Sequence, residues 1–137
     1  MGYAVGLVLA LLVSGLARLA GFDRDRAFYP TILVVIASYY VLFAVMGGSL
    51  RALIVEAMVM SAFALCAVVG LKRNLWLVVA SLALHGVFDF FHARIVHNRG
   101  VPEWWPAFCL AYDVGAAASL AWLSSGFGQG VAFARSR

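Results

Sequence analysis

The segment from Ser81 to His92 carries the residues in this chain that are best suited to chemistry. It places His85, Asp89 and His92 within an otherwise apolar run. At ~100° per residue, these three positions and Ser81 fall within roughly 80° of one another on a helix. Histidine and aspartate at this spacing can exchange protons or bind a metal ion. Because ionisable groups at membrane depth are costly and usually face a bundle interior or a cavity, we expect a functional site on this helix.

The composition of the chain indicates which class of protein carries this helix. Of its 137 residues, 65% are hydrophobic and 12% are charged, and the mean hydropathy is +0.98. A soluble domain of this size could not keep so much apolar surface away from water. The sequence therefore predicts an integral membrane protein. Its net charge of +4 follows from the loops and calls for no nucleic-acid partner.

Five apolar runs are separated by polar or glycine-containing turns. Each is about 17–21 residues long, close to the ~20 residues that cross a ~30 Å hydrocarbon core. They cover residues 3–19, 30–46, 50–70, 75–91 and 104–123. We predict an all-α bundle of five transmembrane helices over residues 1–123, followed by a flexible cytoplasmic tail over residues 124–137.

The basic residues predict the orientation of the bundle. Because cytoplasmic connections are enriched in Lys and Arg, the side with more of these residues is expected to face the cytoplasm. That side holds seven of the ten: Arg18, Arg24, Arg26, Lys72, Arg73, Arg135 and Arg137. The N-terminus then lies outside and the C-terminus in the cytoplasm, and the bacterial inner (plasma) membrane is the predicted location.

Two further acids lie at depths similar to those on the histidine-bearing helix. Counted from the outer ends of their helices at 1.5 Å per residue, Glu56 is ~9 Å deep and Asp113 ~13 Å deep. By the same arithmetic Asp89 is ~6 Å deep, His85 is ~12 Å deep and His92 lies at the rim. We therefore expect these side chains to line one pocket in the outer half of the bilayer.

Three interpretations of this site remain open. His85, Asp89 and His92 would form a shell for Zn²⁺ or non-haem iron, with Asp113 or Glu56 as a further ligand. Without a metal, His85 and Asp89 would act as base and orienting partner, and Asp113 or Glu56 as the complementary acid. The third interpretation is a structural polar network.

Cys109, one turn before Asp113, could join the site as a soft ligand. Both Cys109 and Cys66 are otherwise typical of small buried hydrophobic residues. All three histidines lie on or just after one helix, which disfavours two axial haem ligands from facing helices.

Small residues recur at every fourth position in the first and last helices. Such stripes allow membrane helices to approach closely, either within the bundle or in a homo-oligomer. The alternative is that Gly and Ala are simply frequent in this chain. The stripes are Gly2, Gly6, Ala10 and Ser14 in the first helix, and Ala107, Ala111, Gly115 and Ser119 in the last.

Three segments of the chain resemble a family of small bacterial and fungal membrane proteins of unknown function. They are FYPTILVVIASYY at 28–40, HGVFDFFH at 85–92 and VPEWWPAFCLAYD at 101–113. This resemblance covers most of the chain and implies no particular activity. The polar pattern is also similar to that of membrane hydrolases with intramembrane zinc, which use Ser-x3-His, a distant Asp and a final His-x3-His. Here Ser81-x3-His85 is present, whereas the final pair is absent.

The residues lead to one functional hypothesis and two alternatives. We expect a small membrane-embedded enzyme that acts on a lipophilic small molecule by His/Asp acid–base or metal-assisted chemistry. The first alternative is a transporter or channel that handles protons or cations, although the inner half of the membrane lacks a comparable polar cluster. The second is an accessory subunit of a larger membrane complex, which the small size favours.

Overall fold

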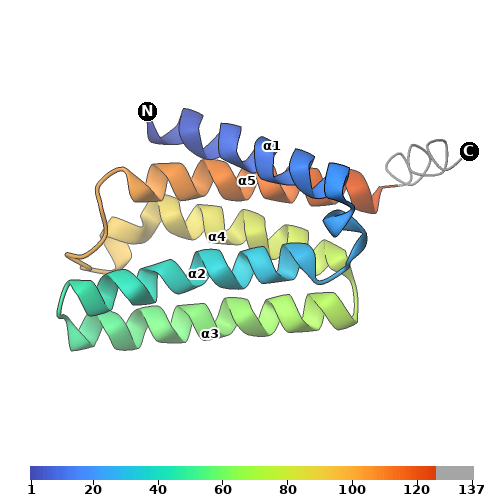
Figure 1. Ribbon diagram of the computed structural model, residues 1–137. Helices are drawn as coiled ribbons and strands as arrows, with labels where there is room; N and C mark the ends of the chain where they lie inside the picture. The colour runs from blue at the N-terminus through green and yellow to red at the C-terminus, as the bar shows by residue number, and fades with distance from the viewer. Residues whose placement is uncertain (126–137) are drawn as a thin grey trace, which may run out of the picture.

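The computed structural model describes residues 1–125, which form five long helices (Figure 1). The short 3₁₀ helix η1 (Phe22–Arg24) follows the first of them. The predicted all-α bundle of five helices is confirmed for the described residues, and all five long helices are long and apolar enough to cross a membrane. The helices are α1 (Gly2–Ala20), α2 (Phe28–Met46), α3 (Leu50–Lys72), α4 (Leu75–Ile95) and α5 (Trp105–Ser124).

The observed helix bounds lie close to the predicted spans. The largest difference is at the end of α4, which continues past the predicted residue 91 to Ile95. Ser124, assigned to the tail from the sequence, is the last residue of α5. Ser125 follows as the C-cap of α5, and the remaining residues of the predicted flexible tail, 126–137, lie outside the described residues.

Local sequence signals explain where several helices begin and end. The side chains of Ser49 and Asn74 cap α3 and α4 by accepting hydrogen bonds from the backbone N–H groups of Ala52 and Trp76. Such caps satisfy donors that the first turn of a helix leaves free. Helix α1 ends at Gly21, whose φ of 81° is a left-handed conformation that glycine adopts without strain.

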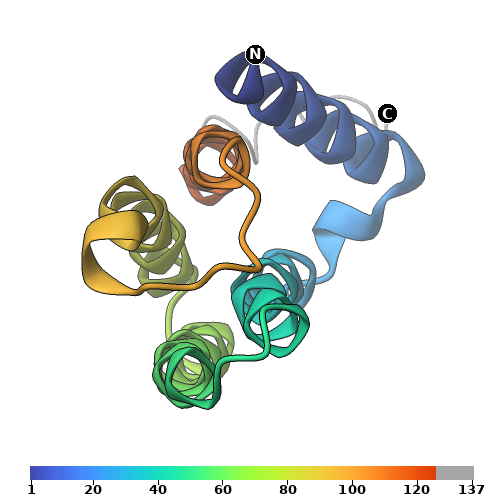
Figure 2. The same cartoon turned by 90° about the vertical axis from the view of Figure 1, so that its left-hand side faces the viewer.

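The end-on view shows how the helices are arranged (Figure 2). Helix α4 packs against both α3 and α5, and α2 packs mainly against α3. Among the other long helices, α1 contacts α5 alone. The bundle is therefore closed around α4, whereas α1 stands apart from α2.

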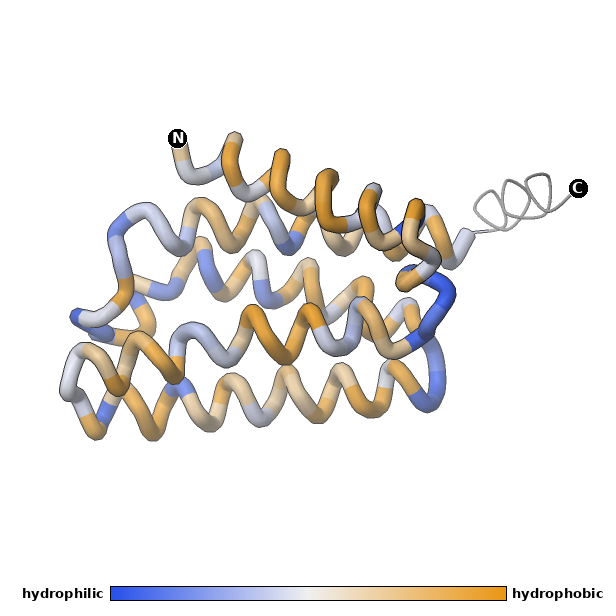
Figure 3. Tube along the Cα trace, viewed as in Figure 1, coloured by the Kyte–Doolittle hydropathy of each residue, from blue (hydrophilic) through white to orange (hydrophobic). Residues whose placement is uncertain are grey.

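The surface of the bundle is suited to lipid. Large apolar side chains such as Leu7, Leu12 and Leu16 on α1 are exposed. Hydrophilic residues gather at the turns and at a few positions on the inner helices (Figure 3). Such an apolar surface is the one expected of helices that face lipid acyl chains.

The two predicted small-residue stripes pack against each other within the chain. A Cβ on Gly2 would lie 3.3 Å from Cβ of Ala107, and one on Gly115 would lie 2.7 Å from Cβ of Ala10. A Cβ on Gly6 would collide with the carbonyl oxygen of Phe108. Because glycine has no side chain, the backbones of α1 and α5 can approach each other closely.

The connection between α4 and α5 folds over the end of α2. A Cβ on Gly47, which follows α2, would lie only 2.8 Å from the backbone nitrogen of Gly100. Val96 in the same connection is buried. This packing brings Asn98 over the polar residues of the bundle interior.

Candidate functional site

Four buried side chains from α4 and α5 form what we call the His85 cluster: His85, Asp89, Cys109 and Asp113. The Nδ1 atom of His85 lies 2.7 Å from Oδ2 of Asp113 and 3.4 Å from Oδ2 of Asp89. One ligand atom from each of the four side chains lies within 4.8 Å of the others. Each of the four residues is at most 1% exposed.

Helix geometry explains why these four side chains meet. His85 and Asp89 are one turn apart on α4, and Cys109 and Asp113 are one turn apart on α5, so each pair shares a helix face. Between the helices lies Gly86, where a Cβ would be 3.1 Å from Cδ1 of Leu110. The glycine lets α5 approach closely enough for its two polar residues to reach those on α4.

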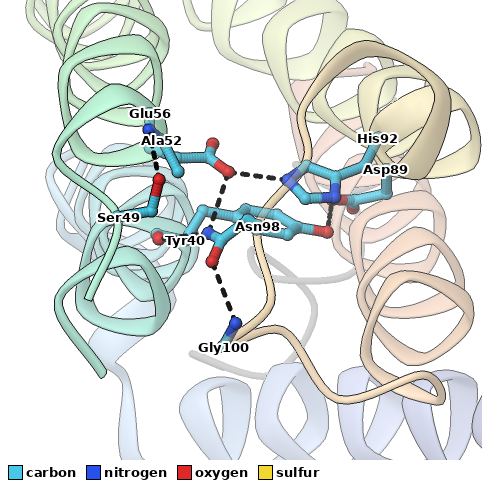
Figure 4. Close-up of polar contacts among 8 residues, drawn as sticks. All are labelled: Tyr40, Ser49, Ala52, Glu56, Asp89, His92, Asn98 and Gly100. Atoms are coloured by element: carbon cyan, nitrogen blue, oxygen red, sulfur yellow. Dashed lines mark hydrogen bonds and ion pairs between the residues drawn. The ribbon is translucent and has the colours of Figure 1, made fainter. Parts of the chain in front are cut away.

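A second group, the Glu56 cluster, consists of Glu56, His92 and Asn98 (Figure 4). Nε2 of His92 lies 2.7 Å from Oε1 of Glu56. The side-chain amide of Asn98 donates to the same oxygen at 3.1 Å. Glu56 and His92 are 1% and 2% exposed, so the connection between α4 and α5 covers this cluster.

Tyr40 on α2 connects the two clusters (Figure 4). Its hydroxyl donates to Oδ1 of Asp89 at 2.6 Å. Its ring stacks on that of His92, with 4.1 Å between centroids and 22° between the ring planes. Its backbone carbonyl accepts a hydrogen bond from the Asn98 amide at 3.2 Å. The ionisable residues thus belong to one network that joins α2, α3, α4, α5 and the connection between the last two.

The charges within this network do not balance by themselves. It contains three carboxyl groups and two imidazoles. Its close ion-pair contacts are all between a histidine and a carboxyl group, and none involves a lysine or arginine. With both imidazoles protonated and all carboxyls ionised, one negative charge remains, and a buried net charge is expensive. The network must therefore take up a further proton or a cation.

Several buried atoms of the network also have unused capacity for bonding. Four of them lack a hydrogen-bond partner among the described residues: Glu56 Oε2, His85 Nε2, Asp89 Oδ2 and Asp113 Oδ1. Leaving a buried polar group unpaired costs about 1–3 kcal/mol. These four atoms could therefore accept a further bond within the buried network.

The structure brings most of the sequence-predicted residues together. His85, Asp89 and Asp113 are in direct contact, and Glu56 joins the network through His92. His92, however, does not share a ligand set with His85 and Asp89 as predicted. The two histidines are seven residues apart, or ~10.5 Å along a helix. His92 is not among the four residues whose ligand atoms lie within 4.8 Å of one another, and its Nε2 instead contacts Glu56.

Two members of the network were not identified as site residues from the sequence. Asn98 lies in a polar turn, which is where solvated residues normally occur. Tyr40 and its neighbour Tyr39 have the same side chain, yet Tyr40 is 1% exposed and Tyr39 is 37% exposed. The rotation of α2 about its own axis determines which of the two tyrosines is buried. Ser81 lies outside the network, because its hydroxyl donates to the Leu77 carbonyl within α4.

A cavity of about 470 Å³ lies between α1, α2 and α5, where α1 stands apart from α2. Its walls are mostly apolar, and they include Leu9, Val13, Ile36, Tyr112 and Cys109. Cys109 thus belongs both to the cavity wall and to the His85 cluster. Glu56, Asp89 and Asp113 are at most 1% exposed and do not line this cavity. The sequence had instead suggested that these acids line an outward-facing pocket.

Comparisons of the chain with protein-family models, curated proteins and solved structures found no match, so the assignment of this site rests on its geometry.

Proposed function

We propose that the protein is a small membrane-embedded enzyme that acts on a lipophilic substrate. The observation that supports this proposal is the position of Cys109 between an apolar cavity and the His85 cluster. The cavity volume falls within the ~300–1,000 Å³ that is typical of small-molecule sites. A lipophilic molecule that moved sideways from the bilayer into the cavity would reach Cys109, the member of the His85 cluster that lines the cavity, without crossing water.

His85 is the residue to which we assign proton transfer. A carboxylate oxygen can only accept hydrogen bonds, so Nδ1 of His85 carries the proton shared with Asp113 Oδ2. In this tautomer Nε2 is a base, and a carboxylate behind the ring stabilises the imidazolium formed when Nε2 takes up a proton. Asp89, held by the Tyr40 hydroxyl, adds a second carboxylate beside Nδ1.

Glu56 has a different place in this proposal. Its close contacts are to His92 and Asn98, in the cluster next to the α4–α5 connection. It can therefore exchange protons with that end of the network, while Asp113 and Asp89 serve His85 directly.

Zn²⁺ or non-haem iron would also suit the histidine and carboxylate donors of the site. Such an ion would supply Lewis-acid chemistry, polarising a carbonyl or activating water. The chain would then contribute the ligands, the apolar cavity and the hydrogen bonds that orient the ligands.

We also propose that the Glu56 cluster lies near the outer face of a bacterial inner membrane. Five described basic residues, Arg18, Arg24, Arg26, Lys72 and Arg73, belong to the end of the bundle that includes η1. Three, Arg51, Arg94 and Arg99, belong to the opposite end. The positive-inside tendency then places the η1 end in the cytoplasm, with the N-terminus outside.

Proton or cation handling is the second candidate function, and the unbalanced charge of the network favours it. Against a transport pathway, the bundle interior beyond His85 is packed with apolar side chains such as Val78, Leu82 and Leu120. An accessory role in a larger complex would leave the juxtaposition of cavity and cluster without a use. The enzyme therefore remains the preferred function.

Lipid analysis can test this proposal. The purified protein would be reconstituted in vesicles made from a bacterial total lipid extract, and the lipids compared by mass spectrometry after incubation. We expect the wild type to convert at least one lipid species, His85→Gln to lose this conversion, and His97→Gln to retain it. His97 is exposed and makes a matched control. Identical lipid profiles for the wild type and a folded His85→Gln variant would overturn the enzymatic proposal.

A further inference from the structure

We propose that the His85 cluster binds one Zn²⁺ ion through the imidazole of His85, the carboxylates of Asp89 and Asp113, and the thiolate of Cys109. This set includes a sulfur ligand and excludes His92. It stands independently of the enzymatic proposal, because an ion held by four protein ligands could also be structural.

The geometry of the four side chains is close to that of a zinc site. Zinc bonds of 2.0–2.3 Å in a tetrahedron place ligand atoms about 3.3–3.7 Å apart. The ligand atoms here lie within 4.8 Å of one another, and the His85–Asp113 contact is 2.7 Å. An ion at the centre would lengthen the shortest contact and shorten the longest by about 1 Å. Side-chain rotation can supply such shifts, because both helices already direct their pairs toward each other.

Zinc binding also leaves the charge of the cluster unchanged. Binding to the imidazolium form of His85 replaces two protons, because ligands must be deprotonated. One proton leaves Nδ1 while Nε2 keeps its own, and the other leaves the thiol of Cys109. Two released protons balance one divalent cation. The buried surroundings therefore face no additional net charge, and the carboxylates of Asp89 and Asp113, each with an unpartnered oxygen, gain a contact.

The donor set selects among metals. Thiolate and imidazole are soft or borderline donors that favour zinc over Mg²⁺ and Ca²⁺, which prefer oxygen alone. The hydroxyl of Tyr40 on Asp89 Oδ1 supplies the outer hydrogen bond that commonly orients a metal-bound carboxylate. Of the four ligands, Cys109 also forms part of the cavity wall. Dissociation of its thiolate would open a coordination position toward the cavity.

The test measures metal directly. The protein would be purified in detergent through a tag without histidine, and its metals measured by inorganic mass spectrometry. We expect close to one zinc per chain in the wild type and loss of at least 90% of it in His85→Ala and Cys109→Ser. Cys66→Ser, which alters an exposed cysteine, and His92→Ala should keep it.

Cobalt substitution adds a readout that a merely structural role for Cys109 would not produce. The Co²⁺-loaded wild type and Cys66→Ser should show thiolate-to-cobalt charge-transfer absorption, and a folded Cys109→Ser variant should lack it. Folding of each variant is checked by its thermal unfolding transition. Zinc content that is equal in the wild type and the folded Cys109→Ser and His85→Ala variants would overturn the site. Loss of zinc from folded His92→Ala would overturn the proposed ligand set.

Discussion

His85 on α4 and Asp113 on α5, 28 residues apart in the chain, are joined by a 2.7 Å contact between Nδ1 and Oδ2. Both residues are fully buried, and the contact ties together the two helices that carry the candidate site. It is therefore expected to stabilise the bundle as well as to orient the imidazole.

Replacing Asp113 by alanine should destabilise the protein by about 3–5 kcal/mol, because it leaves a buried histidine without its main partner. Thermal or chemical unfolding in detergent measures this change in the free energy of unfolding. Glu103→Gln is a suitable control because Glu103 is exposed. This substitution should change the free energy of unfolding by no more than about 0.5 kcal/mol.

A double-mutant cycle with His85→Ala separates the contact from other effects of each change. We expect the two substitutions to be non-additive, with a coupling of about 1–3 kcal/mol, as for residues in direct contact. Strict additivity would show that the two side chains do not interact in the membrane protein.

Asn98 should hold the α4–α5 connection against the bundle. Its amide donates to Glu56 and to the Tyr40 carbonyl, and its own carbonyl oxygen accepts from the Gly100 N–H. Asn98→Ala is expected to cost about 1–3 kcal/mol, because Glu56 and the Tyr40 carbonyl each lose a hydrogen bond. It should also speed hydrogen exchange in residues 96–104. His97→Ala, at an exposed neighbouring position, should leave both quantities unchanged.

The contact between α1 and α5 can be tested with a matched pair of glycines on the same helix. Gly6→Leu should destabilise the protein by at least about 1–3 kcal/mol, because the new side chain meets the backbone of Phe108. Gly15 has nothing within 4 Å of an added Cβ, so Gly15→Leu should be neutral or slightly stabilising. Equal unfolding midpoints for the two variants would rule out the packing described for α1.

The orientation of the bundle is a separate prediction. Alkaline phosphatase, which is active only outside the cytoplasm, should give activity when fused within residues 98–102 and none when fused within residues 72–74. The basic residues near η1 and after α3 are the physical reason, since the positive-inside tendency keeps them in the cytoplasm. The reverse pattern would place the Asn98 connection in the cytoplasm and the candidate site in the inner half of the membrane.

The sequence predicts the helices well because their lengths reflect one physical constraint, the thickness of the hydrocarbon core. It also predicts that His85, Asp89 and Asp113 converge, because isolated acids at similar membrane depths would be costly. The predicted grouping of His92 with His85 and Asp89 differs from the structure, where His92 contacts Glu56 on the neighbouring helix α3.

Other parts of the site depend on which helices pack against each other. The pattern of apolar residues along the chain does not predict these neighbours. Glu56 pairs with His92 because α3 and α4 are adjacent at that height. Cys109, already a candidate soft ligand from its spacing to Asp113, joins His85 and Asp89 because α5 packs against α4. Rotation about α2 buries Tyr40 and exposes Tyr39, although both lie in the same apolar run.

The position of α1 has a consequence for biosynthesis. Among the long helices α1 contacts only α5, the last of the five to be made. In a chain whose helices insert in sequence order, α1 therefore enters the bilayer before its packing partner has been made. The arrival of α5 then completes two events at once, because one face of α5 receives α1 and another brings Asp113 to His85. Until α5 inserts, the protein has neither the cavity that α5 helps to line nor the contact between His85 and Asp113.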